Sequence, residues 1–299
     1  MGKFLKIMKN IIVIINLLFG FFYCSSQSFV VADEVTRDGI PFVTLSQNDK
    51  GLYSDNNGKV SCKDFDTSKI IYISHLNYKN ITILCNSISD TIFLTANPIE
   101  LNEVLVSTIK SKLVTVNPSS KSNNFGSWVL KPKTELLSLV IPATKKKVLL
   151  KEIVLPFVRS NERLRGNDTI NVALVRINLY NVKEDKAAEQ IFSSGPVKIN
   201  SLEKERLNIN LSGENIMVSS VGFYIGIEML GYSNQQNKIV EKGSYVRPAL
   251  SSKSRLVLKT YVRNIFSNPT SLINVSEILR ERSQMNIGER YLSVGITYQ

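Results

Sequence analysis

The sequence has very little of the residues that most enzyme sites use. It contains one histidine, His75, one tryptophan, Trp128, and three cysteines in 299 residues. It has no G-x-S-x-G elbow, Walker loop, G-x-G-x-x-G turn or H-E-x-x-H motif, and no His or Cys cluster with metal-ligand spacing. A Ser-His-Asp arrangement would have to use His75. We therefore expect no enzymatic activity, no metal and no cofactor, although two carboxylates such as Glu152 and Glu228 can converge in a fold without leaving a sequence signature.

The longest uncharged apolar run, Ile11 to Tyr23, lies at the N-terminus, after three lysines and before small polar residues. These are the three regions of a secretory signal peptide. The run is short for a membrane-spanning helix, which needs roughly 20 apolar residues. We predict that residues 1–26 are a signal peptide and that the protein is exported to the periplasm, outer membrane or surface of a bacterial envelope. An uncleaved anchor and lipidation of Cys24 are the alternatives, and the bulky Phe22 and Tyr23 disfavour lipidation.

The net charge is strongly positive, which limits the classes of partner that we expect. Loss of the three N-terminal lysines lowers the formal net charge from +12 to +9. Such a charge favours an anionic envelope surface or an acidic glycan, although lysines spread over solvated faces would give the same number. No run of basic residues interleaved with aromatics indicates nucleic acid. We expect envelope proteins or glycans as partners, and membrane association only through the N-terminus or an outer-membrane partner.

Residues 27–108 contain short β-branched and aromatic runs separated by turn residues, without a sustained helical stripe. Runs of this length and spacing indicate an antiparallel β-sandwich or barrel. The predicted strands are 28–33, 40–47, 69–78, 80–86 and 90–97, with a hairpin over 51–65 that turns at 55–58. By alternation, His75 shares a face with Ile71 and Ile73, so we expect it to cap the edge of a core.

The cysteines that remain after cleavage, Cys62 and Cys85, both lie in apolar runs that resemble strands. Export permits a disulfide between them. Because both lie in apolar runs, we favour two reduced core cysteines, unless the two strands are neighbours, in which case the disulfide is the alternative.

Several segments of this first domain, in order and spacing, resemble the carboxypeptidase regulatory-like domain of the Gram-negative bacterial envelope. The matching residues are Val31, Asp33, "GIPFVTLS" at 39–46, "SDNNGKV" at 54–60, "YISHLNY" at 72–78 and "IFLTANPIELNEVLV" at 92–106. The resemblance implies a small transthyretin-like β-sandwich without a catalytic site of its own.

The same family of domains often precedes the plug and barrel of TonB-dependent transporters. Fewer than 200 residues follow Val106, whereas such barrels have about 22 strands. We therefore expect at most an accessory partner of an outer-membrane transporter.

A Ser-, Lys- and Asn-rich stretch at 109–124 predicts a linker, and longer apolar runs follow it. We predict an all-β chain: a small transthyretin- or immunoglobulin-like β-sandwich, then a larger jelly-roll-like β-sandwich over 125–299. One short helix is expected near 276–284, with Ser276 as N-cap. The segments "INLYN" and "FYIGIEMLG" also resemble a C-terminal β-sandwich that accompanies this regulatory-like domain in uncharacterised exported proteins, and this resemblance implies no activity.

Alternation assigns faces to the two most apolar strands of the second domain. Val175, Ile177 and Leu179 share one side of their strand, as do Phe223, Ile225, Ile227 and Met229 of the other, which leaves Arg176, Asn178, Tyr180, Tyr224, Gly226, Glu228 and Leu230 on the opposite face. An unpaired carboxylate there is costly to desolvate.

Glu228 therefore needs either solvent or a cross-strand partner such as Arg176, or it belongs to a ligand site. In the second case Trp128, Arg176, Tyr180, Tyr224 and Glu228 would together meet a polar ligand such as a sugar. The leading hypothesis is a non-catalytic exported binding or structural module, with a glycan-binding protein or adhesin and a carboxylate-dependent hydrolase as alternatives.

Overall fold

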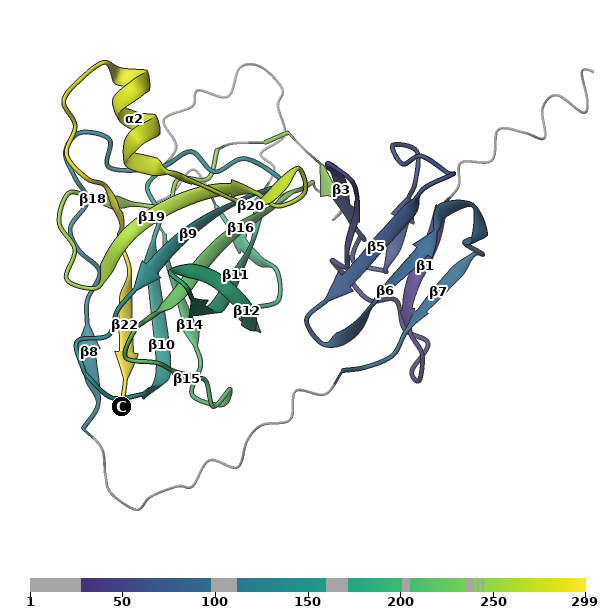
Figure 1. Ribbon diagram of the computed structural model, residues 1–299, viewed down its shortest axis with the longest axis horizontal. Helices are drawn as coiled ribbons and strands as arrows, with labels where there is room; N and C mark the ends of the chain where they lie inside the picture. Colours follow the sequence, from purple (N-terminus) through teal and green to yellow (C-terminus); the bar gives the residue numbers. More distant parts are fainter. Residues whose placement is uncertain are drawn as a thin grey trace, which may run out of the picture.

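The computed structural model describes residues 28–97, 112–159, 172–200, 205–234, 239–240, 242–243 and 245–299. The predicted signal peptide, including Cys24, lies outside these residues. The described chain is built almost entirely of strands, with one α-helix of more than one turn, so the predicted all-β class is confirmed. Figure 1 shows two groups of strands, a smaller one from β1 to β7 and a larger one from β8 onward.

The smaller group is a sandwich of two sheets. Among the described residues, one sheet has the order β4-β1-β7 and the other β3-β2-β5-β6. The strands are β1 (Ser28–Asp33), β2 (Thr44–Gln47), β3 (Lys50–Tyr53), β4 (Lys59–Ser61), β5 (Ile70–His75), β6 (Tyr78–Leu84) and β7 (Thr91–Leu94). Val31 and Leu94 from one sheet and Leu45, Ile71 and Ile73 from the other are fully buried in a common core.

The predicted hairpin over 51–65 is wrong, although its turn is correct. The amide N–H of Gly58 donates to the carbonyl oxygen of Asp55 at 3.1 Å, and Gly58 has a φ of 74°, a conformation that favours glycine. However, β3 pairs with β2 and β4 pairs with β1, so the turn carries the chain from one sheet to the other. Turn chemistry fixes the reversal, but the sheet that each strand joins depends on the rest of the core.

The larger group is a second sandwich. In the described part of the chain, its main sheet has eight strands in the order β12-β11-β16-β9-β19-β20, with β13 beside β11 and β17 beside β16. These strands are β9 (Thr134–Val140), β11 (Val172–Lys183), β12 (Lys186–Ser193), β13 (Val197–Ile199), β16 (Phe223–Ser233), β17 (Ile239–Val240), β19 (Val257–Asn264) and β20 (Asn268–Asn274).

The facing sheet has the order β14-β10-β22-β8, with β15 also pairing with β10. Its strands are β8 (Val114–Val116), β10 (Val148–Pro156), β14 (Arg206–Asn210), β15 (Met217–Val218) and β22 (Gly295–Tyr298), and β18 (Leu250–Ser251) pairs separately with β21 (Tyr291–Leu292). Leu150, Ile153 and Ile296 from this sheet pack with Ile177 and Ile225 from the main sheet in one apolar core. Burial of such side chains on both inner faces holds a sandwich together.

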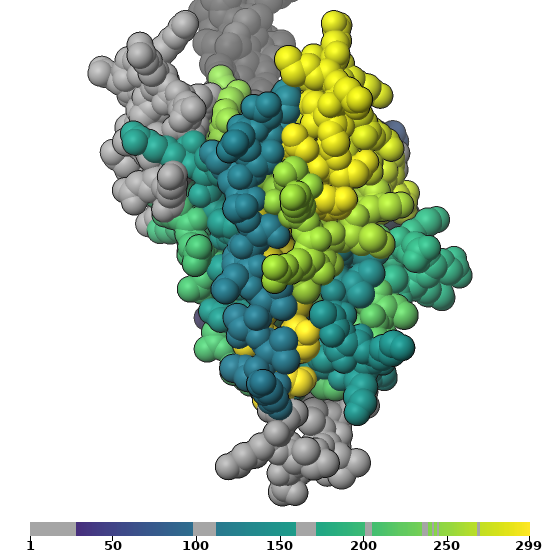
Figure 2. Space-filling view, turned by 90° about the vertical axis from the view of Figure 1, so that its left-hand side faces the viewer, coloured from purple at the N-terminus to yellow at the C-terminus, as the bar shows by residue number. Residues whose placement is uncertain are grey.

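Part of the predicted linker at 109–124 belongs to the second sandwich. Strand β8 lies within it and pairs antiparallel with β22, and Ser119 accepts a hydrogen bond from the side chain of Ser293 through its carbonyl oxygen. Figure 2 shows the segment that follows residue 112, in blue, running along the face of this sandwich beside the yellow C-terminal residues. The prediction was wrong here because a strand of only three residues, VTV, lies inside a Ser-, Lys- and Asn-rich stretch that resembles a linker.

Helix α2 (Val275–Ser283) confirms the predicted helix, but its N-cap is Asn274 instead of Ser276. The side-chain oxygen of Asn274 accepts from the Ser276 N–H at 2.8 Å, and the Ser276 hydroxyl accepts instead from the N–H of Arg290. No helix in the described residues is both long and apolar enough to span a membrane.

Candidate functional site

The outer face of the main sheet carries the charged residues that the sequence places off the core. The predicted inner residues are all fully buried, namely Val175, Ile177, Leu179, Phe223, Ile225, Ile227 and Met229. Their neighbours on the opposite face, including Arg176, Tyr180, Tyr224 and Glu228, are buried as well. Both faces of the central strands are therefore covered, and the charged face does not meet solvent.

Arg176 and Glu228 form the cross-strand pair that the sequence predicts. They lie opposite each other in the register of β11 and β16, and Nε of Arg176 is 3.3 Å from Oε2 of Glu228. This nitrogen is not aligned for a hydrogen bond, so the contact is an ion pair. The other carboxylate oxygen, Oε1, accepts a hydrogen bond of 2.7 Å from the hydroxyl of Tyr53, a residue of the small sandwich.

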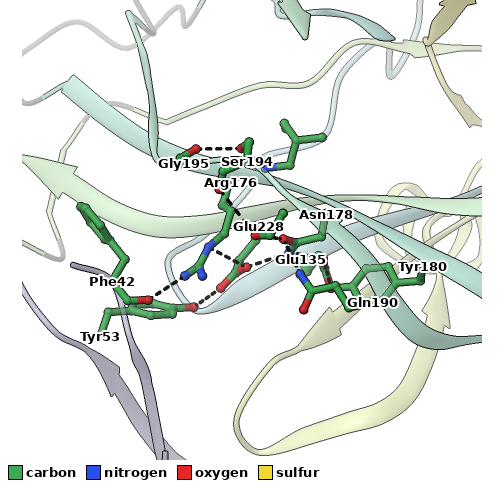
Figure 3. Close-up of polar contacts among 12 residues, drawn as sticks. Phe42, Tyr53, Glu135, Arg176, Asn178, Tyr180, Gln190, Ser194, Gly195 and Glu228 are labelled. Carbon is green, nitrogen blue, oxygen red and sulfur yellow. Dashed lines mark hydrogen bonds and ion pairs between the residues drawn. The ribbon is translucent and has the colours of Figure 1, made fainter. Parts of the chain in front are cut away.

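A second carboxylate, Glu135, lies beside Glu228 across the β9–β16 pair. Its Oε1 accepts from the hydroxyl of Tyr180 at 2.8 Å, and its Oε2 accepts from Nε of Arg263 at 2.7 Å. The side-chain amide of Asn178 donates to both carboxylates, at 3.0 Å to Glu135 and 2.8 Å to Glu228. We call Tyr53, Glu135, Arg176, Asn178, Tyr180, Glu228 and Arg263 the polar cluster, most of which is drawn in Figure 3.

The polar cluster is electrically balanced, and its two carboxylates are buried. It contains two glutamates and two arginines, and the side chains of Glu135 and Glu228 are only 1% and 7% exposed. Buried charges of this kind persist only when their partners and hydrogen bonds compensate for lost hydration. Burial and the charge of Glu228 raise the pKa of Tyr53 well above its usual range, and burial and Glu135 do the same for the pKa of Tyr180. Both phenols therefore stay protonated and act as donors.

The small sandwich covers the part of this face next to Arg176. Phe42 packs against Leu174 and Leu230, and its carbonyl oxygen accepts from Nη2 of Arg176 at 3.3 Å. Nearby, the rings of Tyr53 and Phe266 are 5.4 Å apart. This surface, which we call the docking face, joins an edge strand of the small sandwich to the main sheet of the large one.

The five predicted ligand residues do not form one open surface. Trp128 lies in the inner core of the large sandwich, whereas Tyr180 and Tyr224 belong to a separate apolar cluster on the outer face. The hydroxyl of Tyr224 donates to the carbonyl oxygen of Asp185 at 2.7 Å, which ties it to the β11–β12 turn. With Arg176 and Glu228 paired to each other, the positions chosen from the sequence serve the interior and the docking face.

The sequence named Glu152 and Glu228 as carboxylates that could converge, but the structure pairs Glu228 with a different acid. Glu152 lies on β10 in the facing sheet, and the acid that meets Glu228 is Glu135. Glu135 could have been found by the reasoning applied to Glu228, because it too is a carboxylate within an apolar strand, "TELLSLV". In contrast, nothing in the sequence around Tyr53 indicates that its hydroxyl donates to Glu228.

His75 and the cysteines lie elsewhere. His75 is half-buried in a cleft between the two sandwiches, and burial together with the charge of Arg176 lowers its pKa to about 4. Cys62 and Cys85 are free thiols in hydrogen-bond contact within the small core, where burial and Cys85 raise the pKa of Cys62 to about 12. The disulfide considered from the sequence is therefore not formed in this structure.

Within the described residues, no group of three or more His, Cys, Asp or Glu side chains is arranged to hold a metal ion.

Comparison with known proteins gives little. No family profile matches the chain, and no curated protein matches it. Two solved viral chains align at 8% identity over 91% of this chain: one from infectious bursal virus-derived T=1 particles, with a TM-score of 0.26, and one from the Gx strain of infectious bursal disease virus, with a TM-score of 0.25. The chain spans 60% and 59% of their lengths.

Proposed function

We propose that this chain is an exported, non-catalytic binding or structural module of the bacterial envelope. The small sandwich is then a carboxypeptidase regulatory-like domain, as its segments at 39–46, 54–60 and 92–106 suggest by resemblance. The signal-peptide pattern of residues 1–26 supports export, and the basic charge supports contact with an anionic envelope.

The observation that carries the non-catalytic part is the occupation of all four carboxylate oxygens of the polar cluster. Tyr53 and Asn178 donate to the two oxygens of Glu228, while Tyr180, Asn178 and Arg263 donate to those of Glu135. A carboxylate that acts as nucleophile or proton donor must reach its substrate directly. Here the pair instead stabilises a sheet and a domain contact.

The export part is tested by expressing the full chain with a C-terminal tag in a Gram-negative host and separating cytosol, periplasm and membranes. We expect recovery from the periplasm or envelope with Gln27 as the first residue in mass spectrometry. A matched variant, Leu17→Arg, interrupts the apolar run and is expected to stay in the cytosol. Recovery of the unaltered chain in the cytosol with Met1 intact would refute export.

The binding or structural part is tested by crosslinking the same cells before fractionation. Recovery of defined envelope proteins, or of an outer-membrane transporter, with the tagged chain is the expected result. A chain that crosslinks to nothing and sediments as a free monomer in the periplasm would contradict a structural role.

A further inference from the structure

The two sandwiches enclose a cleft that the polar cluster does not fill. Its main part has a volume of ≈ 680 Å³ and continues past Ser193, Ser194 and Gly195 into a smaller part of ≈ 140 Å³, which ends at His75 and Arg176. The main volume lies within the range of roughly 300–1,000 Å³ that small-molecule sites have, and such sites favour domain interfaces.

Both sandwiches contribute walls to the cleft. The small one supplies the turn between β5 and β6, at Leu76 and Asn77, and the residues after β7, at Ala96 and Asn97. The large one supplies the end of β12, the strand β14 and the loop that follows it. Neither sandwich alone forms the cleft, so any ligand site here exists only while the docking face is intact.

The chemistry of the walls is that of neutral hydrogen-bonding groups beside apolar ones. Four asparagines, Asn77, Asn97, Asn208 and Asn210, line the main part and are exposed. A primary amide carries both donors and an acceptor, which suits hydroxyl groups that donate and accept at once. The side-chain oxygen of Asn210 already accepts from the Ser212 N–H at 2.9 Å, so Asn210 offers its amide donors. The apolar groups between them are the partly buried Ile191, Phe192 and Ile209 and the buried Ile216.

Charge is scarce on these walls. Glu214 is the single acid among the residues that line the main part, and Arg176, at the inner end, is already paired with Glu228. The hydroxyls of Ser193 and Ser194 donate to Asn178 and to the carbonyl oxygen of Gly195, so they serve the protein itself. The asparagine amides are thus the main polar groups that face a ligand.

We propose that this cleft binds a short neutral oligosaccharide, with the asparagine amides bonding its hydroxyls and the apolar residues meeting its C–H faces. The site differs from the outer-face positions considered from the sequence. It rests on the binding part of the proposed function and does not depend on export, because it concerns the purified protein alone.

The test is calorimetric titration of protein purified from cells that express the full chain. The probes are maltotetraose, cellotetraose, xylotetraose and chitotetraose, with tetragalacturonate as the anionic comparison. We expect at least one neutral tetrasaccharide to bind and to lose about tenfold in affinity for each of Asn77→Ala and Asn208→Ala, since each removes a hydrogen-bonding amide. Asn86→Ala, at an exposed asparagine outside the cleft, is the matched control and should leave the affinity unchanged.

A second variant separates the cleft from surface binding. Gly51→Val lies on the docking face, away from the cleft walls, and is designed to part the sandwiches, so it should abolish binding while both sandwiches remain folded by circular dichroism. The proposal is overturned if none of the neutral probes binds at millimolar concentration, if binding survives Asn77→Ala, Asn208→Ala and Gly51→Val alike, or if tetragalacturonate binds best. These outcomes are independent of where the cell places the protein.

Discussion

Gly226 lacks a side chain at the one point of the outer face where Glu135 needs room. It lies between Tyr224 and Glu228 on β16, and a Cβ atom there would overlap Oε1 of Glu135. The carboxylate cannot simply move aside, because Tyr180, Asn178 and Arg263 hold it. The glycine in "FYIGIEML" is therefore explained by a side chain on the neighbouring strand.

Gly226→Ala should accordingly lower the free energy of unfolding by about 1–3 kcal/mol, the usual range for overpacking a buried site. Gly195→Ala is the control, because nothing lies within 4 Å of its added Cβ atom, and its effect should stay within about 0.5 kcal/mol. Chemical denaturation of both variants measures the difference. Equal stabilities would contradict the tight packing of Glu135 against β16.

Glu228→Gln keeps the shape of the side chain but removes its charge, which leaves Arg176 buried without a counterion. Breaking a buried pair in this way costs about 3–5 kcal/mol. The matched control is Glu289→Gln, whose partner Arg280 and own side chain are 38% and 45% exposed, and exposed pairs contribute at most about 1 kcal/mol. Denaturant unfolding of the two variants compares them, and similar losses would mean that the Glu228 site is hydrated.

The residues of the polar cluster could be predicted from the sequence only in part. The pairing of Arg176 with Glu228 followed from alternation and from the cost of a lone buried carboxylate. Glu135 was accessible to the same reasoning, since it lies in the apolar strand β9, whereas Arg263 lies in β19, which mixes polar and apolar residues. Tyr53 was not, because it lies 175 positions from Glu228 and reaches it only after both sandwiches have folded.

At the scale of elements, strands with a clear apolar pattern were predictable, whereas strands inside polar or turn-forming stretches were not. β1 coincides with the predicted strand at 28–33, and β11 and β16, which bury most of their residues, contain the two apolar segments whose faces were assigned from alternation. Strands such as β8 and β20 are short or rich in Pro, Ser, Thr and Asn, which also mark turns. They form strands because the edge of a neighbouring sheet offers them hydrogen bonds. The local sequence does not reveal that edge, because it exists only in the whole fold.

Helix α2 gives a direct test of the assigned cap. Asn274→Ala removes the side-chain oxygen that accepts from the Ser276 N–H and should cost about 1 kcal/mol of stability. Asn86→Ala, at an exposed asparagine without a helix to cap, is the comparison and should change little. If Asn274→Ala matched this control in thermal unfolding, the cap would have to be assigned elsewhere.

At the scale of the whole molecule, two sandwiches that the sequence predicts as separate domains meet through buried charge and aromatic rings. Interfaces between domains of one chain are usually polar and permit relative motion. Here Tyr53 donates to Glu228 and the carbonyl oxygen of Phe42 accepts from Arg176, so parting the sandwiches would remove one hydrogen bond from each member of this buried ion pair. The contact therefore favours one fixed arrangement.

His75 makes this arrangement sensitive to acid. Burial and Arg176 lower the pKa of His75 to about 4 in the folded protein, whereas an unfolded chain protonates it near 6.5. Between these values the unfolded state binds more protons, so stability is fully present above about pH 6.5 and is lost as the pH falls toward 4. His75→Gln cannot titrate and should lack this loss.

Unfolding free energies of the wild type and of His75→Gln, measured from pH 4 to pH 7, check this expectation. After the two unfolding free energies are normalised to their values at pH 7, that of the wild type should fall progressively below that of His75→Gln as the pH decreases. Parallel curves would show that His75 is solvated and that the cleft does not shield it.

The central claim is that the two sandwiches dock through β3, and small-angle X-ray scattering of Gly51→Val tests it most directly. A Cβ atom at Gly51 would overlap the ring of Phe266, which is itself buried beside Tyr53. Because Gly51 lies on an edge strand, valine should not harm the small sandwich. The radius of gyration is predicted to increase for Gly51→Val relative to the wild type and to a Gly195→Val control, and equal radii for all three would contradict the docking.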